Sequence, residues 1–234
     1  MYRVQKLLSK IGYCSRRSAE LLIQSGKIQI NNKTVSIGDK WSIGDTLKVN
    51  GIEIDLSNLT SQKIEVIKYY KPLGEVVSSY DPHNSKSVFD HLPKVNGKWI
   101  NIGRLDLNTT GLLLFTNDGD LANHIMHPSN NLEREYIVHI DKALSKEAIN
   151  NLLNGVPINN NQLGKFNQIE RLEKNKYKVI LTSGKKREIR NSLKYLKIKT
   201  ISLHRTRYAN IFLHDMKEGE YRSLTKDERS IFLI

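Results

Sequence analysis

Apolar residues at helical spacing occur twice near the N-terminus. The first run holds Val4, Leu7, Leu8 and Ile11, and the second holds Ala19, Leu22 and Ile23. Gly12 ends the first run, Ser15 can cap the start of the second, and Gly26 follows its end. Because serine accepts a backbone N–H at a helix start and glycine favours a helix end, this pattern predicts two short helices.

Alternating and continuous apolar runs predict strands in the rest of the chain. Ile28 and Ile30 alternate with polar neighbours, and the uninterrupted run at 112–115 is typical of a buried strand. Similar strand-like segments lie at 47–49, 64–71, 136–140, 177–182 and 200–203, and helical segments fit 118–126, 145–153 and 187–197. The mixture predicts an α+β protein with a mostly antiparallel sheet flanked by helices.

The polar segment at 56–62 divides the chain. It reads Leu-Ser-Asn-Leu-Thr-Ser-Gln and has no apolar period, which is typical of a linker. We therefore expect a small N-terminal module at 1–59 and a larger domain at 60–234.

The distribution of charge points to a polyanionic partner. The chain has 37 Lys and Arg against 24 Asp and Glu, a formal net charge of +13. The excess gathers at 184–210, where nine basic residues accompany one acid, Glu188, and a smaller excess lies at 1–59. Clustered Lys and Arg are the electrostatic footprint expected for binding to a nucleic-acid backbone.

Other sequence features argue against a secreted, membrane or metal-dependent protein. The single Cys14 rules out an internal disulfide, and the N-terminus lacks the apolar core of a signal peptide. No apolar stretch approaches a membrane-spanning length. His124 and His127 are three positions apart but have no obvious third ligand, so we predict no metal site. We expect a cytoplasmic protein.

One carboxylate stands out from this background. Asp106 lies in the sequence Gly-Arg-Leu-Asp-Leu-Asn-Thr-Thr-Gly at 103–111, directly before the buried strand. A rigid strand can hold a loop residue still, as catalysis requires. Spacing alone nevertheless favours a structural role, in which the Asp106 side chain only caps backbone amides of its own turn.

The stretch 103–117 resembles the signature of the bacterial ribosomal pseudouridine synthases typified by the small-subunit enzyme RsuA. Their pattern is Gly-Arg-Leu-Asp, two variable residues, Ser or Thr, one variable residue, Gly, four apolar residues, then Thr and a small polar residue. Every specified position is met here. The resemblance implies that Asp106 is the catalytic residue.

Two further segments extend the resemblance. Arg134-Glu135-Tyr136 matches the family's basic-x-Tyr context, which implies that Tyr136 stacks on the target base. The segment 182–190 matches a third family segment, whose final arginine pairs with the catalytic aspartate and is here Arg190. Arg187 is expected to contact phosphate or the Asp106 loop. The neighbouring Lys185 and Lys186 are further RNA-binding candidates within the basic cluster.

The N-terminal module resembles the S4 RNA-binding fold. The resemblance rests on the order of its elements and on Arg3, Gly12, 15–17, Ala19, 26–27, 30–31 and 44–45. In that fold the second helix and the turn after it face RNA. Arg3, Arg16, Arg17 and Lys27 are therefore the candidates for RNA binding, although each could equally be an ordinary solvated charge.

The implied reaction explains why such residues are needed. The N1–C1′ bond of uridine breaks, the uracil turns, and C5 bonds to C1′, so the nucleotide must leave its helix and enter a pocket. Arg104 is expected to fill the vacated space, because its planar cation can stack on bases and bind phosphate. Asp106 must be ionised, and a covalent adduct and a glycal intermediate both remain open. No metal or redox cofactor is required for an isomerisation.

Within the family, the segments 92–94, 99–100 and 121–128 look most like the large-subunit, RluB-like branch. We therefore expect a monomer that acts on 23S ribosomal RNA or on a pre-ribosomal particle. The alternatives are the same reaction on 16S RNA and a non-catalytic RNA-binding assembly factor that keeps the fold. A glycosidase with paired carboxylates is disfavoured, because no convincing partner acid accompanies Asp106.

Overall fold

The computed structural model describes residues 1–57, 59, 63–78 and 86–232. The chain forms two compact units. The N-terminal unit comprises Met1–Glu65 together with Lys94–Ile100 and Asn117–Gly119, and the C-terminal unit comprises the remainder. Among the described residues, no helix has the length and apolar character needed to cross a bilayer. Part of the predicted linker, at 58 and 60–62, lies outside the described residues.

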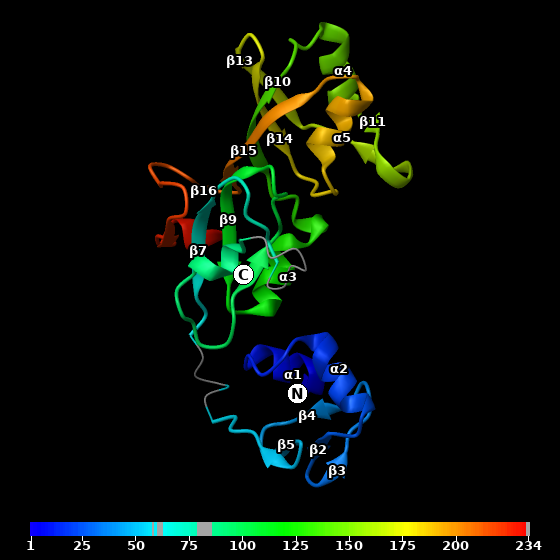
Figure 1. The fold of residues 1–234 in the computed structure, drawn as a ribbon, viewed down its shortest axis with the longest axis vertical. Helices are drawn as coiled ribbons and strands as arrows, with labels where there is room; N and C mark the ends of the chain where they lie inside the picture. Colours follow the sequence, from blue (N-terminus) through cyan, green and yellow to red (C-terminus); the bar gives the residue numbers. More distant parts are fainter. Residues whose placement is uncertain (58, 60–62, 79–85, 233–234) are drawn as a thin grey trace. The chain divides into compact units, whose positions relative to one another are not determined.

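The N-terminal unit contains the two predicted helices, a four-stranded sheet and a separate pair of strands (Figure 1). Its elements are β1 (Tyr2–Arg3), α1 (Val4–Lys10), α2 (Arg16–Gln24), β2 (Ile28–Ile30), β3 (Lys33–Thr34), β4 (Lys40–Trp41), β5 (Leu47–Val49) and β6 (Ile52–Glu53). The sheet has the order β3-β2-β5-β6, and the separate pair is β1 and β4. The Ser15 side chain accepts the Ser18 N–H at 3.0 Å, which confirms the predicted start of α2. The helices and the sheet share one apolar core around Leu7, Leu8 and Ile28.

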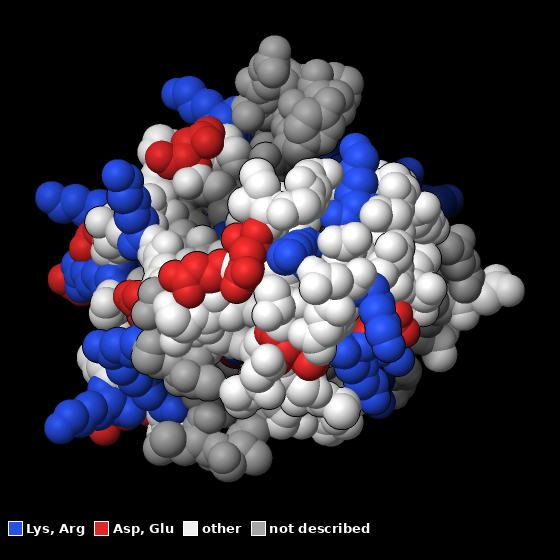
Figure 2. Space-filling view, turned by 90° about the horizontal axis from the view of Figure 1, so that it is seen from below, with Lys and Arg blue, Asp and Glu red and all other residues white. Residues whose placement is uncertain are grey.

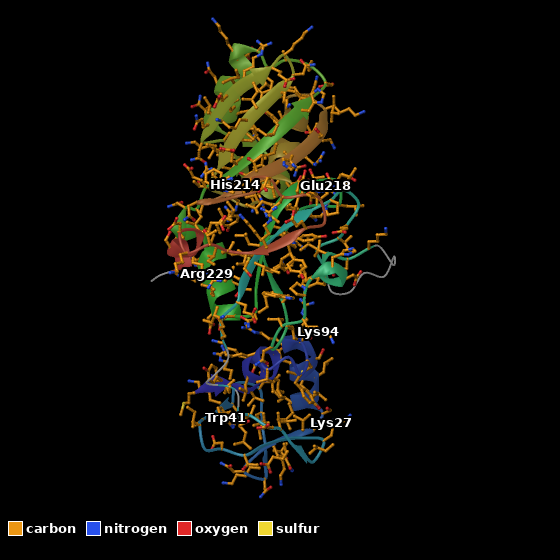
Figure 3. The ribbon with its side chains drawn as sticks, turned by 90° about the vertical axis from the view of Figure 1, so that its left-hand side faces the viewer. Lys27, Trp41, Lys94, His214, Glu218 and Arg229 are labelled. Atoms are coloured by element: carbon orange, nitrogen blue, oxygen red, sulfur yellow. The ribbon has the colours of Figure 1, made fainter. Side chains whose placement is uncertain are left out.

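Trp41 fixes the turn after β4 (Figure 3). Its ring is buried in this core, and its indole N–H donates to the Asp45 backbone oxygen at 2.8 Å. The Asp45 carboxylate accepts the Ser42 N–H at 2.8 Å, and this bond lowers the pKa of Asp45. The small unit thus combines an apolar core with a tightly bonded turn.

A nine-stranded sheet organises the C-terminal unit. Its main path runs β13-β14-β10-β15-β9-β7-β17, and β16 and β8 pair with β15 and β9. These strands are β7 (Val66–Lys71), β8 (Ile100–Ile102), β9 (Thr110–Thr116), β10 (Arg134–Ile140), β13 (Gln168–Glu173), β14 (Lys176–Leu181), β15 (Thr200–Tyr208), β16 (Ile211–Phe212) and β17 (Tyr221–Ser223). Along the main path the pairing is antiparallel except between β9 and β15, so the predicted α+β class with a mostly antiparallel sheet is confirmed.

Helices cover this sheet and complete its core. The helices are α3 (Gly119–Met126), α4 (Lys146–Asn154) and α5 (Glu188–Tyr195), and the short 3-10 helices are η1 (Val88–His91), η2 (Pro128–Asn130), η3 (Asn159–Asn161) and η4 (Glu228–Phe232). A separate two-stranded pair joins β11 (Val156–Pro157) to β12 (Leu163–Gly164). α4 and α5 lie together on one face of β10, β14 and β15 (Figure 1). Their shared core includes Leu152, Leu193 and Val179.

Candidate active site

The signature carboxylate lies in the turn between β8 and β9. Asp106 accepts the Thr109 N–H through its backbone oxygen at 2.9 Å, which closes the turn. Among the described residues, no backbone amide donates to its side chain, which is 37% exposed. The structure therefore does not support the purely local capping role that spacing alone favoured.

Gly111 explains why this turn leads into a rigid strand. Its φ is +107°, and a Cβ at this position would overlap the backbone of Arg205 on the neighbouring strand β15. Only glycine permits that approach, because it lacks a Cβ and adopts positive φ readily. The signature glycine thus brings β9 directly against β15, where Arg205 and Gly111 are paired in parallel register.

Arg187 is the cation nearest the carboxylate. Its Nε lies 3.8 Å from Asp106 Oδ2. Arg187 precedes the first turn of α5 with φ at +52° and ψ at +32°, a left-handed conformation that a non-glycine residue adopts at a cost. The strained backbone places the guanidinium at the carboxylate.

Arg190 does not form the direct pair with Asp106 that the resemblance implied. Its Nη2 donates to the Asn108 backbone oxygen at 2.7 Å, so it binds the Asp106 loop through the main chain. Burial lowers the pKa of Arg190, Asp106 opposes that shift, and nearby Arg187 adds to it. Arg190 lies three residues, about one helical turn, beyond the left-handed Arg187, and from there its guanidinium reaches the loop at Asn108.

Tyr136 approaches the same region from β10. It is half-buried and pairs in register with Val179 on β14 and Arg205 on β15. Arg134, on the same strand, donates to the Thr182 backbone oxygen at 2.7 Å and to the Tyr208 hydroxyl at 3.0 Å. The basic residue of the Arg-x-Tyr segment therefore ties the loop before α5 to the strand that carries Tyr136.

These side chains line one cavity of about 600 Å³ within the C-terminal unit. Its wall includes Asp106, Tyr136, Arg187, Arg190 and Arg205. That volume falls within the range of sites for small ligands, roughly 300 to 1,000 Å³. Segments far apart in the sequence thus converge on a pocket whose described lining holds two carboxylates, Asp106 and Glu188, one aromatic ring and several guanidinium groups.

Lys71 supports the Asp106 loop and was not identified from the sequence. It is fully buried at the end of β7, and its Nζ donates to the backbone oxygens of Thr109 at 3.0 Å and Pro72 at 2.9 Å. Burial lowers the pKa of Lys71 to about 8, although the carboxylates of Glu75, Asp106 and Glu218 oppose the shift. The feature of the sequence that could have identified Lys71 is its position at the end of an apolar strand.

The remaining RNA-binding candidates lie on the surface of their own units. Arg104 and Lys186 are exposed, and Lys185 donates to the Leu163 backbone oxygen. Arg3, Arg16, Arg17 and Lys27 are exposed in the N-terminal unit. Lys27 follows the end of α2 and is labelled in Figure 3. In the face shown in Figure 2, basic side chains lie along the left margin and to the right of the centre, with uncharged atoms and acids between them.

The two histidines that raised the question of a metal have local partners. His127 caps η2, where its Nδ1 lies 2.7 Å from the Ser129 hydroxyl, and the His124 backbone oxygen accepts from Asn130 at 2.6 Å. Among the described residues, no group of three or more metal-ligating side chains is found. The helical segment predicted at 118–126 is confirmed, since α3 spans Gly119–Met126.

Comparison with known proteins agrees with this geometry. The model of the RNA pseudouridylate synthase family matches residues 65–195, and that of the S4 domain matches residues 3–47. A protein of Buchnera aphidicola subsp. Acyrthosiphon pisum named ribosomal large subunit pseudouridine synthase B is 40% identical, and the match covers 96% of this chain and 93% of that protein. A relative of the same name from Pseudomonas aeruginosa is 36% identical over 99% of this chain but only 61% of its own length.

A solved structure described as a pseudouridylate synthase shows the same fold. It aligns with a TM-score of 0.71 at 23% identity, covering 99% of this chain and 100% of that one. The family model spans more than half of the chain, and the Buchnera relative matches nearly all of it. The chain belongs to the RNA pseudouridylate synthase family and carries an S4 domain at its N-terminal end.

Proposed function

We propose that this chain isomerises uridine to pseudouridine in the 23S RNA of the large ribosomal subunit. The observation that carries the proposal is the Asp106 carboxylate beside Arg187 at a cavity that Tyr136 also lines. The two relatives named ribosomal large subunit pseudouridine synthase B support the choice of subunit.

Each cavity residue has a role in this reaction. Asp106 acts at C1′, either by forming a covalent adduct or by promoting elimination to a glycal. Arg187 lies 3.8 Å from this carboxylate and orients it toward the cavity. Arg190 holds the loop through Asn108, and Tyr136 provides a flat surface for the extruded uracil.

The exposed basic residues bind the RNA around the target. Arg104 fills the space left by the flipped nucleotide, while Lys185 and Lys186 contact the backbone beside the cavity. Arg3, Arg16, Arg17 and Lys27 bind RNA through the S4 domain, with 1–59 as the binding module and 60–234 as the catalytic domain. We further propose that the protein acts as a monomer in the cytoplasm.

Tritium release tests the chemistry. When C5 bonds to C1′, the C5 hydrogen leaves, so ribosomal RNA tritiated at uracil C5 reports each turnover. Asp106→Asn should lower the release on the order of 10³-fold or more, because a neutral amide cannot act at C1′. The control Glu147→Gln removes an exposed carboxylate from α4 and should release tritium like wild type.

Two outcomes would contradict the proposal. Equal release from wild type and Asp106→Asn would exclude Asp106 as the catalytic residue. No release from wild type would favour the alternative of a non-catalytic assembly factor. Mapping the pseudouridine that disappears in a deletion strain then decides between 23S and 16S RNA, since the two reactions differ only in the RNA that loses its modification.

A further inference from the structure

Arg205 is a buried cation in the wall of the cavity. It lies on β15 and is only 2% exposed. Its Nε donates to the Leu112 backbone oxygen on β9 at 2.6 Å. Its guanidinium carbon lies 5.5 Å from the ring centre of Tyr208 and 6.0 Å from that of Tyr136. One side chain thus connects the strand after Asp106 with the strand that carries Tyr136 (Figure 1).

The hydrogen bonds of this guanidinium are incomplete. Among the described residues, its buried Nη2 has no hydrogen-bond partner. The same holds for Thr109 Oγ1 and Arg190 Nε, which belong to two other residues of the cavity wall. A buried charge without an anion costs several kcal/mol, and aromatic faces offset only part of that cost. The Arg205 guanidinium in the cavity wall therefore has an N–H donor without an acceptor among the described residues.

The proposed reaction generates an anion at this place. When the N1–C1′ bond breaks, its electron pair stays on the uracil and spreads over N1 and the carbonyl oxygens O2 and O4. C1′ becomes electron-poor until C5 attacks it, and the C5 proton then leaves to solvent. Tyr136 and Arg205 are direct partners in the antiparallel register, so a uracil stacked on Tyr136 lies beside the guanidinium.

We propose that Arg205 donates a hydrogen bond to a carbonyl oxygen of the extruded uracil and stabilises the negative charge that N1–C1′ cleavage leaves on it. This inference rests on the proposed function. A preorganised donor aimed at developing charge typically lowers the barrier by a few kcal/mol, which corresponds to about 10²- to 10³-fold in rate.

A substrate with a better leaving group distinguishes the proposed role of Arg205 from a purely structural role. Fluorine at C5 withdraws electrons and makes the pyrimidine a better leaving group, so cleavage then depends less on the protein. Single-turnover cleavage of N1–C1′ would be measured on 23S RNA fragments containing uridine or 5-fluorouridine. The nucleosides of nuclease digests would be separated by liquid chromatography before mass spectrometry, because uridine and pseudouridine have the same mass. Arg205→Met should slow the uridine substrate about 10²-fold or more. The ratio of the 5-fluorouridine rate to the uridine rate should rise about tenfold above wild type.

Matched variants complete the experiment. Arg207→Met makes the same change two residues along β15, outside the cavity wall, and should leave the ratio at the wild-type value. If Arg205→Met does not fold, Arg205→Lys serves, because an ammonium keeps the charge but not the forked donors; a smaller rise is then expected. An unchanged ratio in the folded Arg205 variant overturns the inference. Absence of wild-type activity on uridine would overturn the proposed function instead.

Discussion

At the residue scale, the arginine that lies beside the Asp106 carboxylate is held in a strained backbone conformation. Arg187 has φ at +52° and places its Nε 3.8 Å from Asp106 Oδ2. Both side chains are substantially exposed, at 58% and 37%, so their pair adds little to stability. Strain that stabilises nothing locally is common where backbone geometry serves function.

Replacing Arg187 should change stability and activity in opposite directions. Arg187→Gly relieves the left-handed strain and should raise the free energy of unfolding by about 1 kcal/mol, while tritium release falls. Lys197→Gly is the matched control, since Lys197 is exposed, has φ at +56° and follows the end of α5. It should gain similar stability in urea unfolding and keep full activity. Equal loss of activity in both variants would contradict a specific role for Arg187.

Lys71 gives the fold a predictable pH dependence. Burial lowers the pKa of Lys71 from 10.5 to about 8 in the folded protein. Between those values the unfolded chain holds a proton that the folded chain has released, so rising pH favours the folded state. The stability of wild type relative to Lys71→Met should therefore increase as pH rises through this window.

Urea unfolding followed by circular dichroism at about pH 7.5 and about pH 10 measures that difference. Titrations elsewhere cancel when the two proteins are compared at each pH. Lys142→Met, at an exposed position, is the control and should show a constant offset. A difference between wild type and Lys71→Met that does not change with pH would show that burial of this amine does not influence the folding equilibrium.

At the element scale, the contact between β9 and β15 fixes the site, and Gly111 permits it. Gly111→Ala should destabilise the protein by about 3 kcal/mol or more, because the new methyl meets the Arg205 backbone and φ is +107°. Gly103→Ala has positive φ but open space around it, so about 1 kcal/mol is expected. Thermal or urea unfolding compares the two, and equal losses would contradict the importance of the close approach.

The sequence predicted some elements well for physical reasons. Helices α1 and α2 and strand β9 have strong apolar patterns and clear end signals, and all three form where expected. β13 was missed because the residues of Gln168–Glu173 are mostly exposed and lack a buried alternation. β15 extends to Tyr208, beyond the predicted end at 203. The extension was missed because it contains Arg205, a charged residue that is buried.

The site shows the same division between local and tertiary information. The turn around Asp106 follows from local chemistry, including Gly103 and the Thr109 bond. The contact with Arg187 depends on a left-handed conformation that a non-glycine residue rarely adopts and that the sequence does not indicate. Lys71 and Arg205 escaped notice because charged residues within strands are usually exposed. Their burial becomes visible only when strands distant in sequence lie side by side.

At the scale of the whole molecule, the unit that contains the S4 domain also takes in segments from later in the chain. Lys10 Nζ lies 2.7 Å from Asp118 Oδ2, and Lys98 Nζ donates to the Cys14 backbone oxygen at 3.1 Å. The predicted division at residue 59 assigns one continuous stretch to each domain. It therefore separates Lys10 and Cys14 from their contacts at Asp118 and Lys98. Charge substitutions are therefore a cleaner test of this unit than deletion of 1–59.

The salt dependence of RNA binding should report the S4 contacts. Each phosphate contact contributes about 0.7 to 0.9 to the slope of log affinity against log salt. Replacing Arg16, Arg17 and Lys27 with Gln should make that slope shallower by about 2 to 3, while the rate at saturating RNA changes little. Filter binding at several salt concentrations measures the slope. The exposed Lys142, Lys146 and Lys174, changed together, are a control of equal charge. The same slope in both triple variants would contradict specific contacts by the S4 residues.

The hydrogen bond between Arg205 and Leu112 also determines when the pocket can assemble during protein synthesis. The two residues are separated by 93 positions, and synthesis at roughly 5 to 20 residues per second takes roughly 5 to 19 s to cover that distance. During this interval the nascent chain already contains Asp106, but its loop lacks the strand against which it is held. The pocket is therefore complete only after β15 has emerged, and a growing chain cannot act on the ribosome that is making it before then.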